Sequence, residues 1–300
     1  MMFSVLIFLF GLIIGSFLNV VIYRLKTKES IFTPHLLKIF FKRRSLSSKG
    51  AGLMTRSHCP KCRVVLRWYD LIPLFSFVLQ KGRCRYCYNR ISWQYPLVEL
   101  AAGILFLLIS FKVLDFRFGI WDLSRIKYGI EIRNLLLLIY WFYIISILII
   151  IFVYDLKHYI IPDRIIYPAI IAAGIWLIFN GVLPLGRDPG LALKDGLLSA
   201  LVASGFFLFL VLVSKGKWMG MGDVKLAVLM GLVLGWPNVL WALFLAFMSG
   251  AVIGLVLIAF KKKTLKSQIP FGPFLAGAAV FMMLFGESLT PHLLNLININ

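Results

Sequence analysis

The chain has 300 residues, of which 61% are hydrophobic, and its mean hydropathy is +0.91. A soluble domain of this size does not need so much apolar surface, and apolar runs long enough to cross a bilayer recur along the chain. The formal net charge is +20. Composition and charge therefore exclude a soluble globular enzyme and predict an all-α, polytopic membrane protein.

Eight hydrophobic segments are predicted to span the membrane as helices, and they lie near 4–23, 97–113, 134–154, 164–180, 196–214, 224–236, 238–260 and 271–287. The first is interpreted as a span, because it has no basic residue ahead of it and no small-x-small cleavage site behind it. We expect three parts: a first span (1–23), a basic loop domain (24–96) and a membrane domain (97–300).

Basic residues predict the orientation. With the N-terminus outside, four loops and their span ends lie in the cytoplasm and contain 25 of the 32 lysines and arginines. Those loops are 24–96, 155–163, 215–223 and 261–270. A surface that faces anionic lipid accounts for the net charge, so no nucleic-acid partner is required. Residues 33–45 mix apolar and basic side chains and are interpreted either as an amphipathic helix in the headgroup plane or as a solvated linker.

All four cysteines of the chain lie in the first of these loops. They form two C-x-x-C pairs, Cys59 with Cys62 and Cys84 with Cys87, at a separation typical of zinc ribbons. Two disulfides are the alternative, and a reducing cytoplasm disfavours them. The spacing predicts a closed, structural Cys₄ zinc site that braces the 24–96 loop.

Among the 12 acidic residues, four fall at the inner membrane boundary: Glu99, Asp155, Asp163 and Asp223. Asp155 ends the third predicted span, while Asp163 and Asp223 begin the fourth and sixth, so alternating topology brings these three to one depth. Two carboxylates that share a site cannot both ionise easily, so one keeps a proton while the other acts as a base. Such a pair can activate a water and protonate an amide leaving group, as in aspartyl proteases.

Simpler roles compete for each aspartate. Asp163 follows a proline and precedes a helix, so N-capping accounts for it. Asp223 is also a possible cap, although the glycines ahead of it supply a close-approach backbone that a cap does not need. Asp155 stands at the C-terminal end of its span, where its charge opposes the helix dipole, unless Lys157 or Arg164 pairs with it.

Two functions without proteolysis are alternatives. An ion-coupled transporter would place its carboxylates near mid-membrane, whereas these lie at one boundary. A zinc-ribbon membrane scaffold would not need the aspartates. Metalloprotease and intramembrane serine protease motifs, H-E-x-x-H and G-x-S-G, do not occur in the sequence.

Five motifs in order resemble those of bacterial type IV prepilin peptidases. They are "GLIIGSFLNVVIYRL" (11–25), "RSHCPKCRVVLRWYDLIPLFSFVLQKGRCRYCYNRISWQYPLVEL" (56–100), "YDLKHYIIPD" (154–163), "GMGDVKLA" (220–227) and "IPFGPFLAGA" (269–278).

The resemblance implies an endopeptidase of the bacterial inner membrane whose catalytic dyad is Asp155 and Asp223. Its implied partners are prepilins and pseudopilins, which are cut after a glycine at the cytoplasmic face. It also implies that S-adenosylmethionine methylates the new N-terminus. Glu99 is a weak candidate for contacting that cofactor or the amine, and a structural role is favoured over it.

Overall fold

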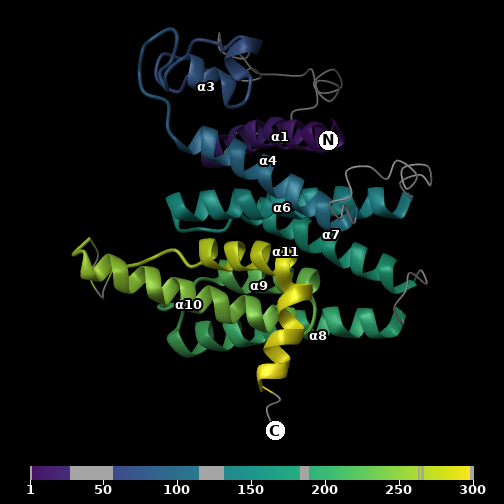
Figure 1. Cartoon of the computed structure of the whole chain (residues 1–300). Coiled ribbons are helices and arrows are strands. Elements are labelled where there is room, and N and C mark those ends of the chain that lie inside the picture. The colour runs from purple at the N-terminus through teal and green to yellow at the C-terminus, as the bar shows by residue number, and fades with distance from the viewer. Residues whose placement is uncertain are drawn as a thin grey trace, which may run out of the picture. The chain divides into compact units, whose positions relative to one another are not determined.

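The computed structural model describes residues 2–27, 57–114, 132–182, 189–262, 264 and 267–297 (Figure 1). Its elements are α1 (Met2–Thr27), η1 (Trp68–Leu71), α3 (Phe75–Leu79), α4 (Gln94–Val113), α6 (Ile132–His158), α7 (Asp163–Val182), α8 (Pro189–Ser214), α9 (Met221–Leu234), α10 (Asn238–Ala259) and α11 (Gly272–Ile297). The described residues contain isolated bridges but no strand. The all-helical prediction is confirmed, whereas segment 33–45 lies outside the described residues.

Each of the eight predicted spans coincides with one of the long helices or with α9. Over the described residues, six helices are long and apolar enough to cross a membrane: α1, α4, α6, α8, α10 and α11. The helix α9 is the exception in length, since its 14 residues extend over about 21 Å at 1.5 Å per residue. That is less than the roughly 30 Å of a hydrocarbon core, so α9 needs other helices around it.

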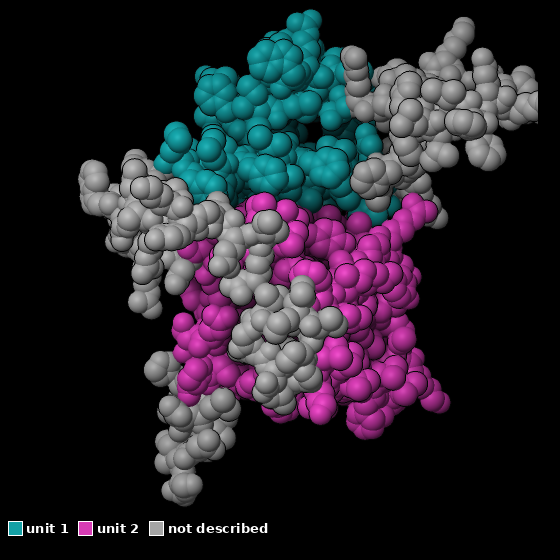
Figure 2. All heavy atoms as spheres, turned by 90° about the vertical axis from the view of Figure 1, so that its right-hand side faces the viewer, with its two compact units in different colours: residues 1–111, 117–121 teal, residues 112–116, 122–300 magenta. Residues whose placement is uncertain are grey.

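The chain divides into two compact units, coloured separately in Figure 2. Unit 1 comprises residues 1–111 with 117–121, and unit 2 comprises residues 112–116 with 122–300. The cysteines belong to the first unit, and Asp155 and Asp223 belong to the second. The three-part organisation expected from the sequence, with limits at 23 and 96, stays a prediction.

In unit 1, α1 and α4 pack closely because glycines face the contact. A Cβ at Gly11 would lie 2.7 Å from the Cα of Gly103, and one at Gly15 would lie 2.6 Å from the Cα of Glu99. One turn further along α1, the buried Asn19 amide donates to the carbonyl oxygen of Tyr95 at 3.2 Å. Small residues at four-residue spacing let two membrane helices approach in this way. The antiparallel pair α1–α4 therefore has a fixed register.

In unit 2, α11 contacts α6, α9 and α10, while α9 also lies against α7 and α8 (Figure 1). The short helix α9 is thus covered by longer ones. Its inner side chains are buried almost completely, among them Leu226, Leu229 and Met230. This packing holds the N-terminal end of α9, which carries Asp223, in a fixed position among its neighbours.

Candidate active site

Asp155 lies three residues before the end of α6, and only 4% of its surface is exposed. Its carboxylate accepts a hydrogen bond from the backbone N–H of Gly272. Gly272 is the first residue of α11, where backbone N–H groups have no partner within the helix. The N-terminal end of α11 therefore provides the compensation that the C-terminal end of α6 cannot give to a negative charge.

Gly272 can approach Asp155 because it has no side chain. A Cβ built on this residue would lie 2.5 Å from Oδ2 of Asp155, well inside van der Waals contact. The surrounding motif (269–278) does not by itself indicate a role for this glycine. The proline that follows it, Pro273, indicates a helix start, but nothing local in the sequence indicates that a carboxylate lies against it.

Asp223 is the third residue of α9 and is half-buried. Its carboxylate accepts a hydrogen bond from the backbone N–H of Gly220, the N-cap residue. This is the position from which an acidic side chain reaches back to the start of its own helix. The carboxyl groups of Asp155 and Asp223 lie close enough to act on each other electrostatically. The structure thus brings together the two aspartates that the sequence singled out.

Asp163 has a different environment. The helix α7 begins at Asp163 itself, and its Oδ1 accepts a hydrogen bond from Nζ of Lys225 in α9. The ammonium group of Lys225 also lies 4.8 Å from the centre of the Tyr167 ring. The side chain of Asp163 is 61% exposed. The carboxylate expected to be an N-cap forms an ion pair that joins the beginnings of α7 and α9.

The arrangement is suited to acid–base chemistry on a peptide bond. One carboxyl is buried and accepts a backbone N–H, and a second, at a helix start, lies within electrostatic range of it. Two such groups share protons as a pair, so one can accept a proton from water while the other supplies one to a leaving nitrogen.

Glu99 lies elsewhere, in unit 1. It is 8% exposed, and its Oε2 accepts a hydrogen bond of 2.9 Å from the backbone N–H of Leu74. The hydroxyl of Ser16 in α1 hydrogen-bonds to the same carboxylate. These contacts join α1, α4 and the segment that begins α3, which is a structural role.

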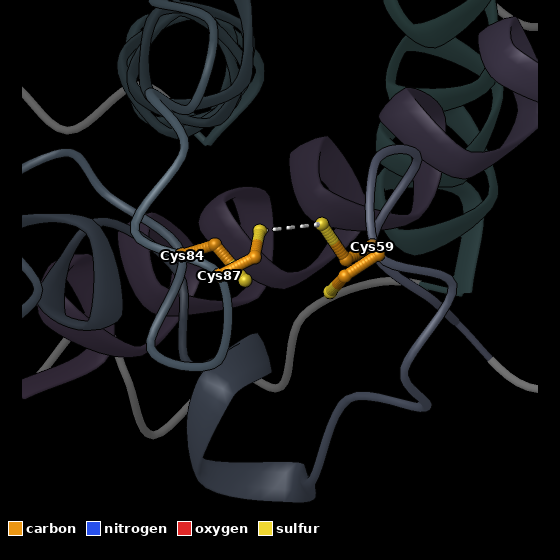
Figure 3. A group of neighbouring side chains, drawn as sticks. Cys59, Cys84 and Cys87 are labelled. Carbon is orange, nitrogen blue, oxygen red and sulfur yellow. Dashed lines mark hydrogen bonds between the residues drawn. The ribbon is translucent and has the colours of Figure 1, made fainter.

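The four cysteines are free and come together in the part of unit 1 that precedes α4 (Figure 3). Their sulfur atoms all lie within 4.8 Å of one another, and the Sγ atoms of Cys59 and Cys87 are 3.9 Å apart. Thiolates bound to one ion at about 2.3 Å in a tetrahedron are separated by about 3.8 Å. The cluster therefore fits a single metal ion.

The two C-x-x-C turns have the same backbone geometry. In the first, Cys59 N–H donates to Val64 O and Arg63 N–H donates to Cys59 O, at 3.0 and 2.9 Å. The second repeats this with Cys84, Asn89 and Tyr88, at 2.8 and 2.9 Å. Arg63 and Tyr88 occupy equivalent positions and both have positive φ, 58° and 57°. The pattern is that of two knuckles, as the spacing predicted.

One thiol of the cluster has a lower pKa than an ordinary cysteine. Hydrogen bonds from the backbone of Asn89 and from neighbouring thiols lower the pKa of Cys87 to about 7. A thiolate is the form that binds metals, so this group is available near neutral pH.

Asp70 joins the turn that contains it, η1, to the second knuckle, a role that the sequence analysis did not assign. Its side chain is 2% exposed and lies 3.4 Å from Nε of Arg85. The backbone N–H of Arg67, the amide of Gln80 and the hydroxyl of Tyr86 donate to it, each at 3.2 Å. Its position as the single acidic residue among basic ones in the cysteine region was the available signal.

Comparison with known proteins adds independent findings. Residues 9–113 match the bacterial peptidase A24 N-terminal domain, and residues 142–255 match the type IV leader peptidase family. No solved structure matches the chain.

Several curated relatives have the name prepilin leader peptidase/N-methyltransferase. The protein of Aeromonas salmonicida (strain A449) is 32% identical over 296 residues, or 97% of this chain and 94% of the relative. That of Myxococcus xanthus (strain DK1622) is 35% identical over 263 residues, or 86% and 64%. That of Bacillus subtilis (strain 168) is 32% identical over 288 residues, or 95% of each.

The matched regions coincide with the two sites described above. The first contains the cysteine cluster, and the second contains Asp155 and Asp223. Similarity that extends over nearly the whole length, in the same order, is not explained by one shared motif. The chain belongs to the type IV leader peptidase family.

Proposed function

We propose that Asp155 and Asp223 are the catalytic pair of an endopeptidase that removes the leader from type IV prepilins and pseudopilins. The observation that carries this proposal is that two carboxyls, one of them buried, interact electrostatically where α6 ends and where α9 and α11 begin. Ionisable side chains within membrane-spanning segments are rare and commonly mark functional sites. The Asp155 carboxylate accepts a backbone N–H, and the charged group that acts on Asp223 is Asp155 itself.

In the proposed reaction, the ionised carboxyl of the pair takes a proton from a water molecule, which attacks the scissile carbonyl carbon. The protonated carboxyl hydrogen-bonds to the carbonyl oxygen, and a proton then passes to the leaving nitrogen as the C–N bond breaks. The pair finishes with one proton between its two members, as it began. The backbone N–H of Gly272 keeps the Asp155 carboxylate oriented during these steps.

The substrate follows from where the pair lies along its helices. Asp155 is near the end of a candidate membrane span, and Asp223 is near the beginning of a short helix. A bond that leaves the bilayer at the membrane boundary is therefore in reach. We place this boundary on the cytoplasmic side of the inner membrane, with the N-terminus outside, because the basic loops favour it.

The proposal extends to two further groups. We infer that the cysteine cluster holds one zinc ion, which closes the fold of the region before α4 and leaves no open position for catalysis. The relatives' name includes N-methyltransferase. We infer that this chain likewise methylates the new N-terminal amine, with S-adenosylmethionine as the methyl donor.

The test is cleavage of a prepilin by the purified chain in detergent. Replacing either Asp155 or Asp223 by Asn removes an ionisable group and should lower the cleavage rate by orders of magnitude. The double variant should be little worse than either single one, since groups acting as a unit are strongly non-additive. Asp163→Asn is the matched control and should retain cleavage. If Asp163→Asn abolished cleavage in a folded protein while Asp155→Asn did not, the pair would be wrongly assigned.

A further inference from the structure

The region before α4 carries an apolar face that no part of the proposed reaction uses. In α3, Phe75, Val78 and Leu79 are 58%, 70% and 62% exposed. They follow the i, i+3, i+4 spacing that places side chains on one side of a helix. Leu71 and Ile72, one turn earlier, are exposed as well. Five large apolar side chains of the segment Leu71–Leu79 are therefore exposed, and together they are called its outer face.

The Phe77 side of α3 contacts other parts of the cysteine region. The ring of Phe77 lies 5.1 Å from that of Trp93, centre to centre. The same ring covers Gly82, where a Cβ would lie 3.2 Å from Cζ of Phe77. The helix is therefore fixed in orientation, and the exposure of its outer face follows from the fold.

The depth of α3 comes from its contact with the two membrane helices of unit 1. Leu74, the N-cap residue of α3, donates its backbone N–H to Glu99. Glu99 is the sixth residue of α4, about 8 Å from the helix start at 1.5 Å per residue. Its other partner, Ser16, lies about 12 Å along α1 from Arg24. Both distances place the start of α3 beside α1 and α4, further into the membrane than the polar residues at the ends of these helices.

The region that carries this face is rich in basic residues. Residues 57–93 contain seven lysines and arginines and one acidic residue, Asp70, which is already paired with Arg85. An exposed tryptophan, Trp68, begins the helical turn ahead of α3. Apolar side chains at the depth of the acyl boundary, with tryptophan and basic residues beside them, match an anionic bilayer surface.

We propose that the outer face of Leu71–Leu79 is inserted into the headgroup–acyl boundary of an anionic phospholipid bilayer. The cysteine region is then held by α1 and α4 and also by a third, interfacial contact that α3 makes. Interfacial helices bury their apolar face about 5–10 Å into this boundary, which agrees with the depth set by Glu99. The inference does not depend on the peptidase assignment.

Photocrosslinking in vesicles tests the proposal. The full chain, with p-benzoylphenylalanine in place of Phe75, is reconstituted into vesicles of phosphatidylglycerol and phosphatidylethanolamine, irradiated and examined by mass spectrometry. The matched control carries the same group in place of Tyr88, an aromatic residue that is 74% exposed on the second knuckle. We expect phospholipid adducts at position 75 in at least about five-fold excess over position 88. We also expect a lower yield when phosphatidylcholine replaces both lipids.

Several outcomes would overturn the proposal. Adducts at position 75 with the chain's own residues 28–56, with a second copy or with added prepilin, in place of lipid, would assign the face to that partner. Equal lipid yields at the two positions would remove the insertion, and equal yields in the two vesicle types would remove the role of anionic headgroups. In a Glu99→Ala background that keeps its metal content, the adduct yield at position 75 should fall. An unchanged yield there would refute the depth argument.

Discussion

The cysteine cluster and the aspartate pair are assembled in opposite ways. All four cysteines lie within residues 59–87, on two turns that repeat the same backbone hydrogen bonds. Asp155 and Asp223 come from α6 and α9, with α7 and α8 between them in the chain, and the backbone donor to Asp155 comes from α11. One site is formed by local turns, and the other depends on how long helices end beside one another.

This difference indicates how each site should respond to change. A local site that binds a metal gains its stability largely from that metal. Loss of the metal should therefore affect only the unit that contains the site. A site built from three helix ends is sensitive to small displacements of any of them.

The largest effect in this comparison is expected from Gly272→Ala. The added methyl group would lie 2.5 Å from Oδ2 of Asp155, so the carboxylate must move from its donor. A displacement of about 1 Å at a catalytic group can lower a rate about 10²-fold. We expect kcat for prepilin cleavage to fall by about 10–100-fold with little change in KM, as measured by steady-state kinetics.

Gly277→Ala is the control for this prediction. Gly277 lies in the same helix, and a Cβ there meets nothing within 4 Å. Alanine in a helix interior is favoured over glycine by roughly 0.5–1 kcal/mol, so this variant should be slightly more stable and fully active. Equal kinetics for the two variants would contradict the close approach of Gly272 to Asp155.

An intermediate effect is expected from Cys84→Ser. Purified under reducing conditions, the unaltered chain should contain about one zinc ion per molecule, and the variant should contain little, as elemental analysis would show. Because a closed Cys₄ site has no catalytic position, prepilin cleavage should be retained at least in part, and methylation should fall more than cleavage. Complete loss of cleavage on chelation, with the cysteine region still folded, would indicate a catalytic metal instead.

These two sites also differ in how far the sequence predicted them. The knuckles were predictable because the C-x-x-C spacing directly encodes a local turn. Topology predicted only that Asp155, Asp163 and Asp223 lie at one depth, since alternating spans bring one helix's end to the depth of another's beginning. The choice of Asp155 and Asp223 as a pair came from the family resemblance. Gly272 was missed because no local pattern encodes its contact with Asp155, and Asp70 was missed although it is the single acidic residue among basic ones in the cysteine region. The partners of Glu99 are a backbone N–H and a serine hydroxyl, and neither contact has a signature in the sequence.

The smallest effect is expected from the ion pair between Asp163 and Lys225. This pair joins α7 to α9 near the proposed site, yet the Asp163 side chain is 61% exposed, and exposed pairs contribute only about 0.2–1 kcal/mol. In a double-mutant cycle of Asp163→Asn and Lys225→Met, thermal unfolding should give a coupling free energy below about 1 kcal/mol. Cleavage by each variant should stay within about three-fold of the unaltered chain, because about 0.6 kcal/mol corresponds to that factor. A coupling of several kcal/mol, or a loss of cleavage as large as that of Asp223→Asn, would make Asp163 part of the reaction. The aspartate pair would then have to be treated as a triad.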